Sequence, residues 1–353
     1  MPSGKARIWA WAAAAAAAAL LMAIWLGLNT GGSTEMLQQK VKSGNLSVDY
    51  SVQQALSDAE QLSLNTVNVP VMVLVDSLRS STMKLDQASL DKARTMIREL
   101  KKRNIRIILE PYPWIASGEL YETEWNPDDI PAFFTHWKTA VLNELIRQVA
   151  VPEQVDVLCI ASNLSYLEAY DDQWLSVAEQ ARAQFDGLIT YKTNWWYTAV
   201  WDESSKQAFQ AKLERPIFGK VDFISVGAYF ELSDQPENTV DQLVEALYGT
   251  TVFDREQNVA GELEQLHNRW NKPIFMGELG FPKRNYAAMY PWNPSPSDVD
   301  NGKEQARGFE AYRRVFTQDW FLGFSVFAIG ENGEDKHYYP SRESVHVIKE
   351  WFK

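Results

Sequence analysis

The sequence predicts a (β/α)8 barrel preceded by an N-terminal transmembrane helix. Apolar, strand-like runs alternate regularly with amphipathic helical stretches from about residue 46 to the C-terminus. Most of the strand-like runs are apolar on both faces, as parallel strands covered by helices are. Eight such units fit between residues 46 and 353, which is a usual length for this barrel. A doubly wound parallel sheet is the alternative.

The expected elements follow from this alternation. A short first strand is expected near 46–50, and the other expected strands are 66–75, 105–111, 155–161, 187–194, 221–229, 273–278 and 322–329. Helices are expected at 52–62, 87–103, 128–148, 173–184, 239–247, 256–270, 303–316 and 341–352. No short internal repeat interrupts this pattern, which argues against a solenoid.

The N-terminal segment has the features of a membrane anchor. Residues 8–28 form an unbroken apolar run, and about 20 such residues can span a bilayer as a helix. Lys5 and Arg7 precede the run, which favours a cytoplasmic N-terminus. We therefore expect an anchor over 1–28, a linker over 29–45 and a barrel over 46–353 on the outer side of a cell membrane crossed once. A cleaved signal peptide is the alternative.

Composition excludes several classes of function. The net charge is −12 and the pI is near 5.0, with no block of Lys or Arg in the main body, so we expect no nucleic-acid partner. Cys159 is the only cysteine; it cannot form an intramolecular disulfide, and burial in a strand is expected for it. The four histidines lack metal-ligand spacing, and no phosphate-binding glycine motif is present. No metal or other cofactor is expected.

Polar side chains gather where the active site of such a barrel is built. Glu110, Asn163, Asn194, Tyr229 and Glu278 fall at the C-terminal ends of their predicted strands. The chain also has fourteen Trp and fourteen Tyr, many in the segments that follow strands, and aromatic rings stack on pyranose rings. We expect an aromatic-lined sugar cleft whose substrate-binding residues are Glu110, Tyr112, Trp114, Asn194, Trp195, Trp196 and Trp292.

In order and spacing, four strand motifs resemble those of one enzyme family. Residues 64–67 (Leu-Asn-Thr-Val) are similar to its Gly-Ala-Asn-Thr-Val strand, and residues 108–111 (Ile-Leu-Glu-Pro) to its Leu-Lys-Pro strand. Residues 190–195 (Thr-Tyr-Lys-Thr-Asn-Trp) look like Thr-Tyr-Ala-Ala-Asn-Trp, and residues 224–229 (Ile-Ser-Val-Gly-Ala-Tyr) like Ile-Gly-Ile-Asp-Ala-Tyr. Over roughly 47–352, the chain resembles clan A of the glycoside hydrolases, most closely the β-mannanases of family 113.

The resemblance implies roles for three residues. Glu278 corresponds to the nucleophile of a retaining mechanism, and Tyr229 would donate its hydroxyl to it. Asn163 stands in Ala-Ser-Asn-Leu, where the family has its acid/base glutamate in Gly-Thr-Glu-Leu, and an amide releases no proton near neutral pH. In a second alignment Asn163 is the asparagine before the acid/base, and Leu164 then occupies the acid position. A structural ion pair for Glu278 and a core position for Tyr229 are the alternatives.

Other departures from the family pattern concern the acid and the floor of the site. Glu110 replaces a family lysine, and Phe327 stands where the family's last strand has a tryptophan beneath the sugar. Carboxyl groups that are candidates to replace the missing acid are those of Glu110, Glu168, Asp171 and Asp172.

Two functions therefore remain open. The first is a retaining glycoside hydrolase or transglycosylase with an altered acid/base, acting on a β-linked, mannan-like or glucan polysaccharide. The second is a catalytically inactive sugar-binding subunit of a membrane assembly that makes or exports a polysaccharide. Both predict a poly- or oligosaccharide partner, and the second adds synthesis or export proteins.

Overall fold

The computed structural model describes residues 35–330 and 336–353. Within Lys40–Lys353, which form one compact unit, eight parallel strands close into a barrel because β1 pairs with both β9 and β2. A short antiparallel strand, β3 (Lys84–Leu85), extends the sheet beside β2. The predicted (β/α)8 barrel is confirmed. Its strands are β1 (Val41–Leu46), β2 (Thr66–Val75), β4 (Arg106–Ile115), β5 (Val157–Ser162), β6 (Leu188–Asn194), β7 (Phe223–Gly227), β8 (Ile274–Leu279) and β9 (Phe321–Ile329).

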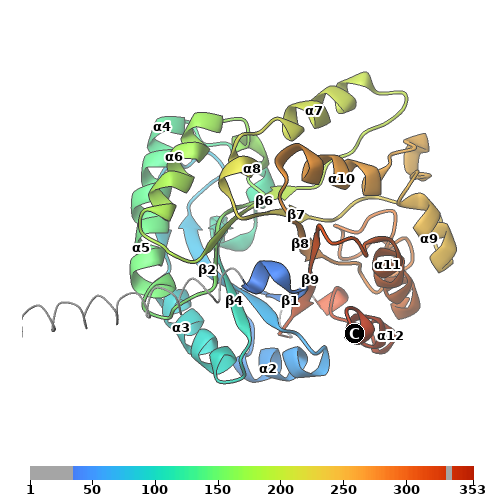
Figure 1. The fold of residues 1–353 in the computed structure, drawn as a ribbon, viewed down its shortest axis with the longest axis horizontal. Coiled ribbons are helices and arrows are strands. Elements are labelled where there is room, and N and C mark those ends of the chain that lie inside the picture. Colours follow the sequence, from blue (N-terminus) through green and yellow to red (C-terminus); the bar gives the residue numbers. More distant parts are fainter. Residues whose placement is uncertain (1–34, 331–335) are drawn as a thin grey trace, which may run out of the picture. The chain divides into compact units, whose positions relative to one another are not determined.

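Helices surround the strands of the barrel (Figure 1). Many begin at a side-chain cap, as where the Asp202 carboxylate accepts hydrogen bonds from the backbone of the first turn of α7. The helices are α2 (Val52–Gln61), α3 (Gln87–Lys101), α4 (Ile130–His136), α5 (Asn143–Leu145), α6 (Asp171–Arg182), α7 (Glu203–Leu213), α8 (Ile217–Lys220), α9 (Val240–Ala246), α10 (Val259–Trp270), α11 (Gly302–Val315) and α12 (Arg342–Glu350). Wider π-helical turns, η3 (Trp137–Leu142) and η4 (Ile146–Ala150), join and extend α4 and α5.

The first strand lies earlier than predicted. Strand β1 covers Val41–Leu46, so the expected strand at 46–50 and the expected linker to residue 45 are both wrong at this point. Its polar residues suggested a linker, but they are buried and bonded inside the unit. The Ser43 hydroxyl donates to Asn68 Oδ1 (2.8 Å), and the Asn45 amide donates to the Gly277 carbonyl (3.0 Å). Lys42 Nζ donates to carbonyls at the C-terminal end of α12, where a helix favours a cation.

The other strands agree with expectation to within a few residues, and the helices less completely. Helices α7 and α8 occupy the segment between β6 and β7, for which no helix was predicted. Helix α7 has only three buried residues along its eleven, so its sequence carries a weak amphipathic signal. Cys159 is buried in β5, as expected.

The predicted anchor at 8–28 lies outside the described residues. Across residues 35–330 and 336–353, every helix is too short or too polar to cross a membrane.

Candidate active site

A buried lysine joins two glutamates of the barrel at the centre of the site. Glu278 lies at the end of β8 as predicted, whereas Glu110 lies in the middle of β4 (Arg106–Ile115) and not at its end, because that strand continues beyond residue 111. Lys192 on β6 places Nζ 2.6 Å from Glu278 Oε1 on β8 and 2.7 Å from Glu110 Oε1 on β4. The lysine side chain is 1% exposed, and those of Glu110 and Glu278 are 7% and 13% exposed. Three strands therefore converge on one ion-paired cluster, and Glu278 is its most accessible member.

The charge of Lys192 is fixed by its two partners. Burial by itself lowers the pKa of an ammonium, but the charges of Glu110 and Glu278 outweigh it and raise the pKa of Lys192 above its usual range. Gly277 leaves room for the lysine stem, because a Cβ there would lie 3.2 Å from both Lys192 Cε and Ser225 Cβ. The Lys192 ammonium is thus a permanent positive charge beside the Glu278 carboxylate.

Asn163 lies just beyond β5 and contacts the same oxygen of Glu278 as Lys192 does. Its backbone is left-handed (φ 54°), a conformation that asparagine tolerates better than most residues. Its side-chain amide donates to Glu278 Oε1 at 3.3 Å and to Glu122 Oε1 at 3.4 Å. The structure therefore brings the two predicted residues Glu278 and Asn163 into contact, and it adds a carboxyl group that sequence reasoning missed.

Glu122 belongs to a short turn, η2 (Glu122–Glu124), in the segment after β4. Burial, followed by the negative charge of Glu278, raises the pKa of Glu122 to about 7. Trp125 follows this turn and anchors it: the side chain is fully buried and donates its indole N–H to the Ser80 carbonyl at 2.9 Å. Glu122 belongs to no sequence motif and does not lie at the end of a strand. Its position depends on the fold of the loop after β4, which the sequence pattern does not predict.

Aromatic rings cluster around Tyr229, just beyond the end of β7. Tyr229 lies two residues beyond β7, and its ring meets those of Trp195 (5.4 Å between centroids) and Phe327 (5.9 Å) edge-on. Tyr338 packs edge-on against Phe327 at 5.2 Å. Phe327, which stands where the family's last strand has a tryptophan, lies on β9 and is half-buried. The bond from the Tyr229 hydroxyl to Glu278 stays a prediction.

Two other predicted substrate-binding aromatics pack within the protein. Trp196 is buried, stacks on Phe209 (5.4 Å) and donates its indole N–H to Glu262 at 2.8 Å; we no longer expect it to stack on a sugar. Trp114 lies against Gly118, where a Cβ would come within 2.4 Å of the indole ring. It is half-buried at the end of β4, as is Tyr112.

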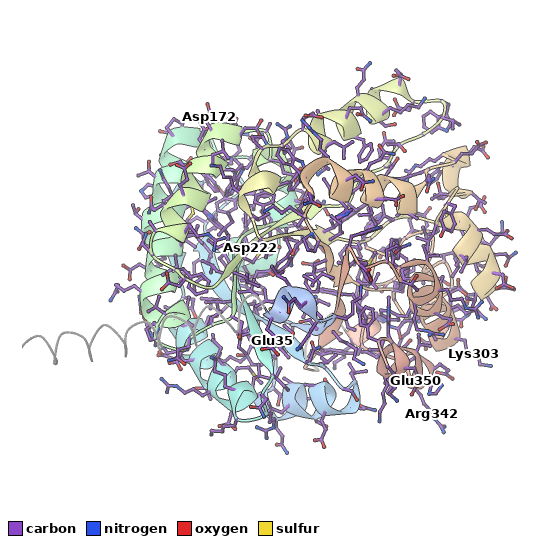
Figure 2. The ribbon with its side chains drawn as sticks, viewed as in Figure 1. Glu35, Asp172, Asp222, Lys303, Arg342 and Glu350 are labelled. Carbon is purple, nitrogen blue, oxygen red and sulfur yellow. The ribbon has the colours of Figure 1, made fainter. Side chains whose placement is uncertain are left out.

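Three of the four predicted substitute acids form ion pairs, and the fourth is exposed. Glu110 pairs with Lys192, as described above. Glu168 is bound by Lys212 Nζ (2.6 Å) and the Thr193 hydroxyl (2.5 Å). Asp171 pairs with Arg215 at 3.2 Å, and Asp172 is exposed at the start of α6, on the periphery of the ribbon (Figure 2). Asn194 holds the loops after β5 and β6 together, since its amide donates to Ser165 Oγ at 3.3 Å.

A second, exposed aromatic group surrounds Arg255. The guanidinium lies over the rings of Tyr197 (4.4 Å to the centroid) and Phe253 (5.0 Å) and pairs with Glu231. Trp292 donates its indole N–H to the same Glu231 carboxylate at 3.0 Å and is 46% exposed. These residues come from the loops after β6, β7 and β8, and their rings are available to a ligand.

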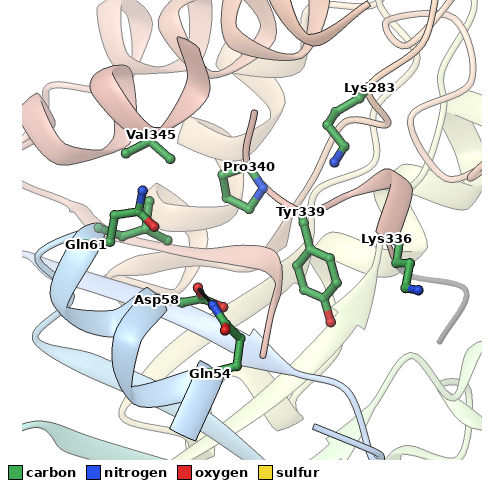
Figure 3. Close-up of a pocket in the computed structure, with 9 residues that line it drawn as sticks. Gln54, Asp58, Gln61, Lys283, Lys336, Tyr339, Pro340 and Val345 are labelled. Atoms are coloured by element: carbon green, nitrogen blue, oxygen red, sulfur yellow. Dashed lines mark hydrogen bonds between the residues drawn. The ribbon is translucent and has the colours of Figure 1, made fainter. Parts of the chain in front are cut away.

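A cavity of ≈ 340 Å³ lies elsewhere, between α2 and the segment that precedes α12 (Figure 3). Its lining includes Gln54, Asp58, Lys283 and Tyr339. None of the predicted site residues lines it.

The family model described as Glycoside Hydrolase Family 113 matches residues 39–343. This range includes every strand of the barrel. The chain belongs to glycoside hydrolase family 113. The resemblance expected from four short strand motifs is therefore confirmed over most of the chain.

Solved structures of the same fold include other members of family 113. The β-mannanase from Alicyclobacillus acidocaldarius in complex with ManMIm has 16% identity and a TM-score of 0.69, with 88% of this chain and 96% of that chain covered. A family 113 β-1,4-mannanase complex has 18% identity and a TM-score of 0.62, covering 89% and 98%. The β-glucuronidase from Ruminococcus gnavus in complex with D-glucuronic acid has 13% identity and a TM-score of 0.55, covering 89% and 49%. At these identities the matches show a shared fold. No curated protein matches the chain.

In this family 113 barrel, two departures from the family's sequence pattern meet in space. Glu110 stands where the pattern has lysine, and Lys192 where it has alanine. The two side chains form an ion pair with each other, and the lysine also reaches Glu278. A positive charge therefore stands beside the strand-end glutamate, supplied from β6.

Proposed function

We propose that this protein is a retaining glycoside hydrolase that acts on a β-linked polysaccharide, mannan-like or glucan, with Glu278 as the nucleophile. The observation that carries the proposal is the position of Glu278 in a family 113 barrel. Its carboxylate lies at the carboxyl end of β8 and is partly exposed, and one of its oxygens accepts hydrogen bonds from the Lys192 ammonium and the Asn163 amide. Carboxyl ends of barrel strands carry the catalytic groups of this fold.

The proposed mechanism follows from the neighbours of Glu278. One carboxylate oxygen is held by Lys192 and Asn163, which fixes the side chain while it attacks the anomeric carbon. A glycosyl-enzyme forms at Glu278, the leaving sugar departs, and water then releases the second sugar with retained configuration. Asn163 orients the nucleophile and cannot itself transfer the proton, so the acid/base must be another group.

A second candidate function rests on that same amide. With Asn163 where the family has its acid/base, the barrel would bind sugar without cleaving it, as a subunit of a membrane assembly that makes or exports a polysaccharide. Incubation with β-1,4-linked manno- and gluco-oligosaccharides, followed by chromatography of the products, separates the two. New reducing ends that disappear in Glu278→Gln support the hydrolase; binding without cleavage supports the subunit.

We predict that Trp292→Ala weakens the binding of a β-linked oligosaccharide by about 1 to 1.5 kcal/mol, because an exposed stacking face is removed. This corresponds to a roughly five- to tenfold increase in Kd. Calorimetry on the inactive Glu278→Gln background measures the binding without turnover. Trp320→Ala is the matched control, because Trp320 precedes β9 at the opposite end of the barrel. An equal change in Kd in the two variants would show that Trp292 does not contact the oligosaccharide.

We propose further that residues 8–28 anchor the protein in a cell membrane, with the barrel on the extracytoplasmic side. Deletion of residues 1–33 should then move the protein from the membrane pellet to the soluble fraction and leave the circular dichroism of the barrel unchanged. Fractionation of cells that express either form measures this. If the truncated protein stays in the pellet, a surface of the barrel holds it there instead.

A further inference from the structure

We propose that Glu122 is the acid/base of this enzyme: it protonates the oxygen of the departing sugar and then deprotonates the attacking water. The inference rests on the proposed function and assigns the proton transfer that Asn163 cannot perform. It stands on the position of Glu122 relative to Glu278 and on the way in which the loop holds it there.

The first observation is that one nitrogen spans both carboxyl groups. Asn163 Nδ2 lies 3.3 Å from Glu278 Oε1 and 3.4 Å from Glu122 Oε1. Two oxygens that share a nitrogen at such distances are separated by at most about 7 Å, a limit that includes the roughly 5 to 5.5 Å at which retaining glycosidases hold their paired carboxyl groups. A glycoside bound beside the pair can therefore be attacked by Glu278 at its anomeric carbon while Glu122 protonates its glycosidic oxygen.

The second observation is that the loop is built to keep Glu122 in place. The turn η2 packs against η5 (Ser165–Leu167), which directly follows Asn163. Trp125, at the end of η2, is buried edge-on against Phe133 (5.0 Å between centroids) and Trp137 (6.2 Å). The Glu122 side chain is thereby carried over the end of β5, which is the place of the family's acid/base.

The surroundings of Glu122 suit a group that must give up and take back a proton. Burial disfavours its charge, Glu278 repels it, and the Asn163 amide and the Lys192 charge oppose these effects more weakly, so that its pKa is raised to about 7. A group with this pKa is half protonated near neutrality, where a general acid/base is most effective. Glu110, the remaining charge of the cluster, is paired with Lys192.

Glu122 and Glu278 together account for every proton transferred and every bond formed or broken in the two steps. In the first step a Glu278 oxygen bonds to the anomeric carbon, the bond to the glycosidic oxygen breaks, and the Glu122 proton passes to that oxygen, which leaves as an alcohol. In the second step water attacks the anomeric carbon, its proton passes to the Glu122 carboxylate, and Glu278 leaves as a carboxylate. The sum is one water consumed per linkage cleaved.

Glu122→Gln tests the assignment, with Glu124→Gln as its matched control. Glu124 is an exposed glutamate at the other end of the same turn. On a natural β-linkage we expect kcat/KM to fall by ~10²- to 10⁴-fold in Glu122→Gln and to stay unchanged in Glu124→Gln. Aryl glycosides with low-pKa leaving groups need no proton, so the burst of released phenol should survive in Glu122→Gln. We expect kcat/KM of the wild type to fall above about pH 7, and this fall should be absent from Glu122→Gln.

Azide provides the second arm. In Glu122→Ala the glycosyl-enzyme lacks a base for water, and azide needs none, so azide should accelerate turnover and give a glycosyl azide of retained configuration. If Glu122→Ala keeps wild-type activity on natural linkages and the same pH profile, the assignment is wrong. The same holds if Asn163→Glu alone raises activity about 10²-fold or more, because that result would show that the wild type has no acid.

The outcomes also separate this inference from the proposed function. Loss of all activity in Glu278→Gln together with full activity in Glu122→Ala overturns only the role of Glu122. A wild type that cleaves no β-linked substrate, natural or aryl, overturns both.

Thermal unfolding adds a readout independent of turnover. Because the folded-state pKa of Glu122 lies above its ordinary value, its protonation stabilises the fold at low pH, and this contribution is lost as the pH rises toward 7. Glu122→Gln should therefore gain Tm relative to the wild type between pH 5 and pH 8; an equal difference at both values contradicts the raised pKa.

Discussion

Replacing Glu278 by alanine should abolish glycoside cleavage, with kcat reduced by at least ~10⁴-fold because the covalent route is removed altogether. The loss should extend to aryl glycosides, since a good leaving group replaces the proton donor and not the nucleophile. Glu278 lies at the carboxyl end of β8 with one oxygen held by Lys192 and Asn163, so its removal also leaves room for a small anion on the same side of the sugar.

Azide distinguishes this loss from a general loss of structure. In Glu278→Ala, azide takes the nucleophile's place and should give a glycosyl azide of inverted configuration, while the same anion with Glu122→Ala should give the retained one. NMR of the two products reads the configuration directly. Activity of Glu278→Ala within about tenfold of the wild type would show that this carboxylate is a structural ion-pair residue and not the nucleophile.

Replacing Lys192 by methionine should destabilise the barrel by about 3 to 5 kcal/mol, the usual cost of removing one partner of a buried ion pair. Methionine fills a similar volume, so the cost arises from the two carboxylates of Glu110 and Glu278 left facing each other without a cation. In the wild type the folded state raises the pKa of Lys192, so the stabilisation is fully present below the ordinary lysine value of about 10.4 and is lost only as the pH rises above it.

Urea denaturation at pH 7 measures the change in the free energy of unfolding. Lys206→Met is the control, because Lys206 pairs with Glu203 on the surface (side chains 42% and 72% exposed) and its loss should change little. The double variant Lys192→Met with Glu110→Gln should recover part of the stability, since one carboxylate fewer is left without a partner. If Lys192→Met were as stable as the wild type, the ion pairs of Lys192 with Glu110 and Glu278 would contribute nothing to the stability of the fold.

The sequence predicted the architecture because a parallel strand covered by helices has a simple signature. Strand β2, for example, is apolar along almost its whole length, and its bounds Thr66–Val75 match expectation. Strand β1 was displaced because Lys42, Ser43 and Asn45 read as linker, although each has a hydrogen-bond partner inside the barrel. Burial of a polar residue that is paired far along the chain leaves no local trace in the sequence.

Only the site residues that lie on strands or at their ends could be predicted from the sequence. Glu278 and Asn163 could be placed because each lies at or just beyond the carboxyl end of a strand, and the barrel fixes where such ends meet. Lys192 was not singled out from the sequence: it lies 82 residues from Glu110, and their contact depends on the reach of a lysine side chain from one strand to another. Glu122 had no signal at all, because its position is set by the fold of a loop.

Covalent trapping tests most directly whether Glu278 is the nucleophile of a retaining glycoside hydrolase. A 2-deoxy-2-fluoro glycosyl fluoride, in the manno and gluco forms, has a leaving group that needs no acid and a fluorine that slows release of the glycosyl-enzyme. Mass spectrometry of the digested protein should find the fluorosugar on the peptide that contains Glu278, and Glu278→Gln should carry no label. A label on a different carboxylate, or none with either sugar while oligosaccharides still bind, would contradict the account.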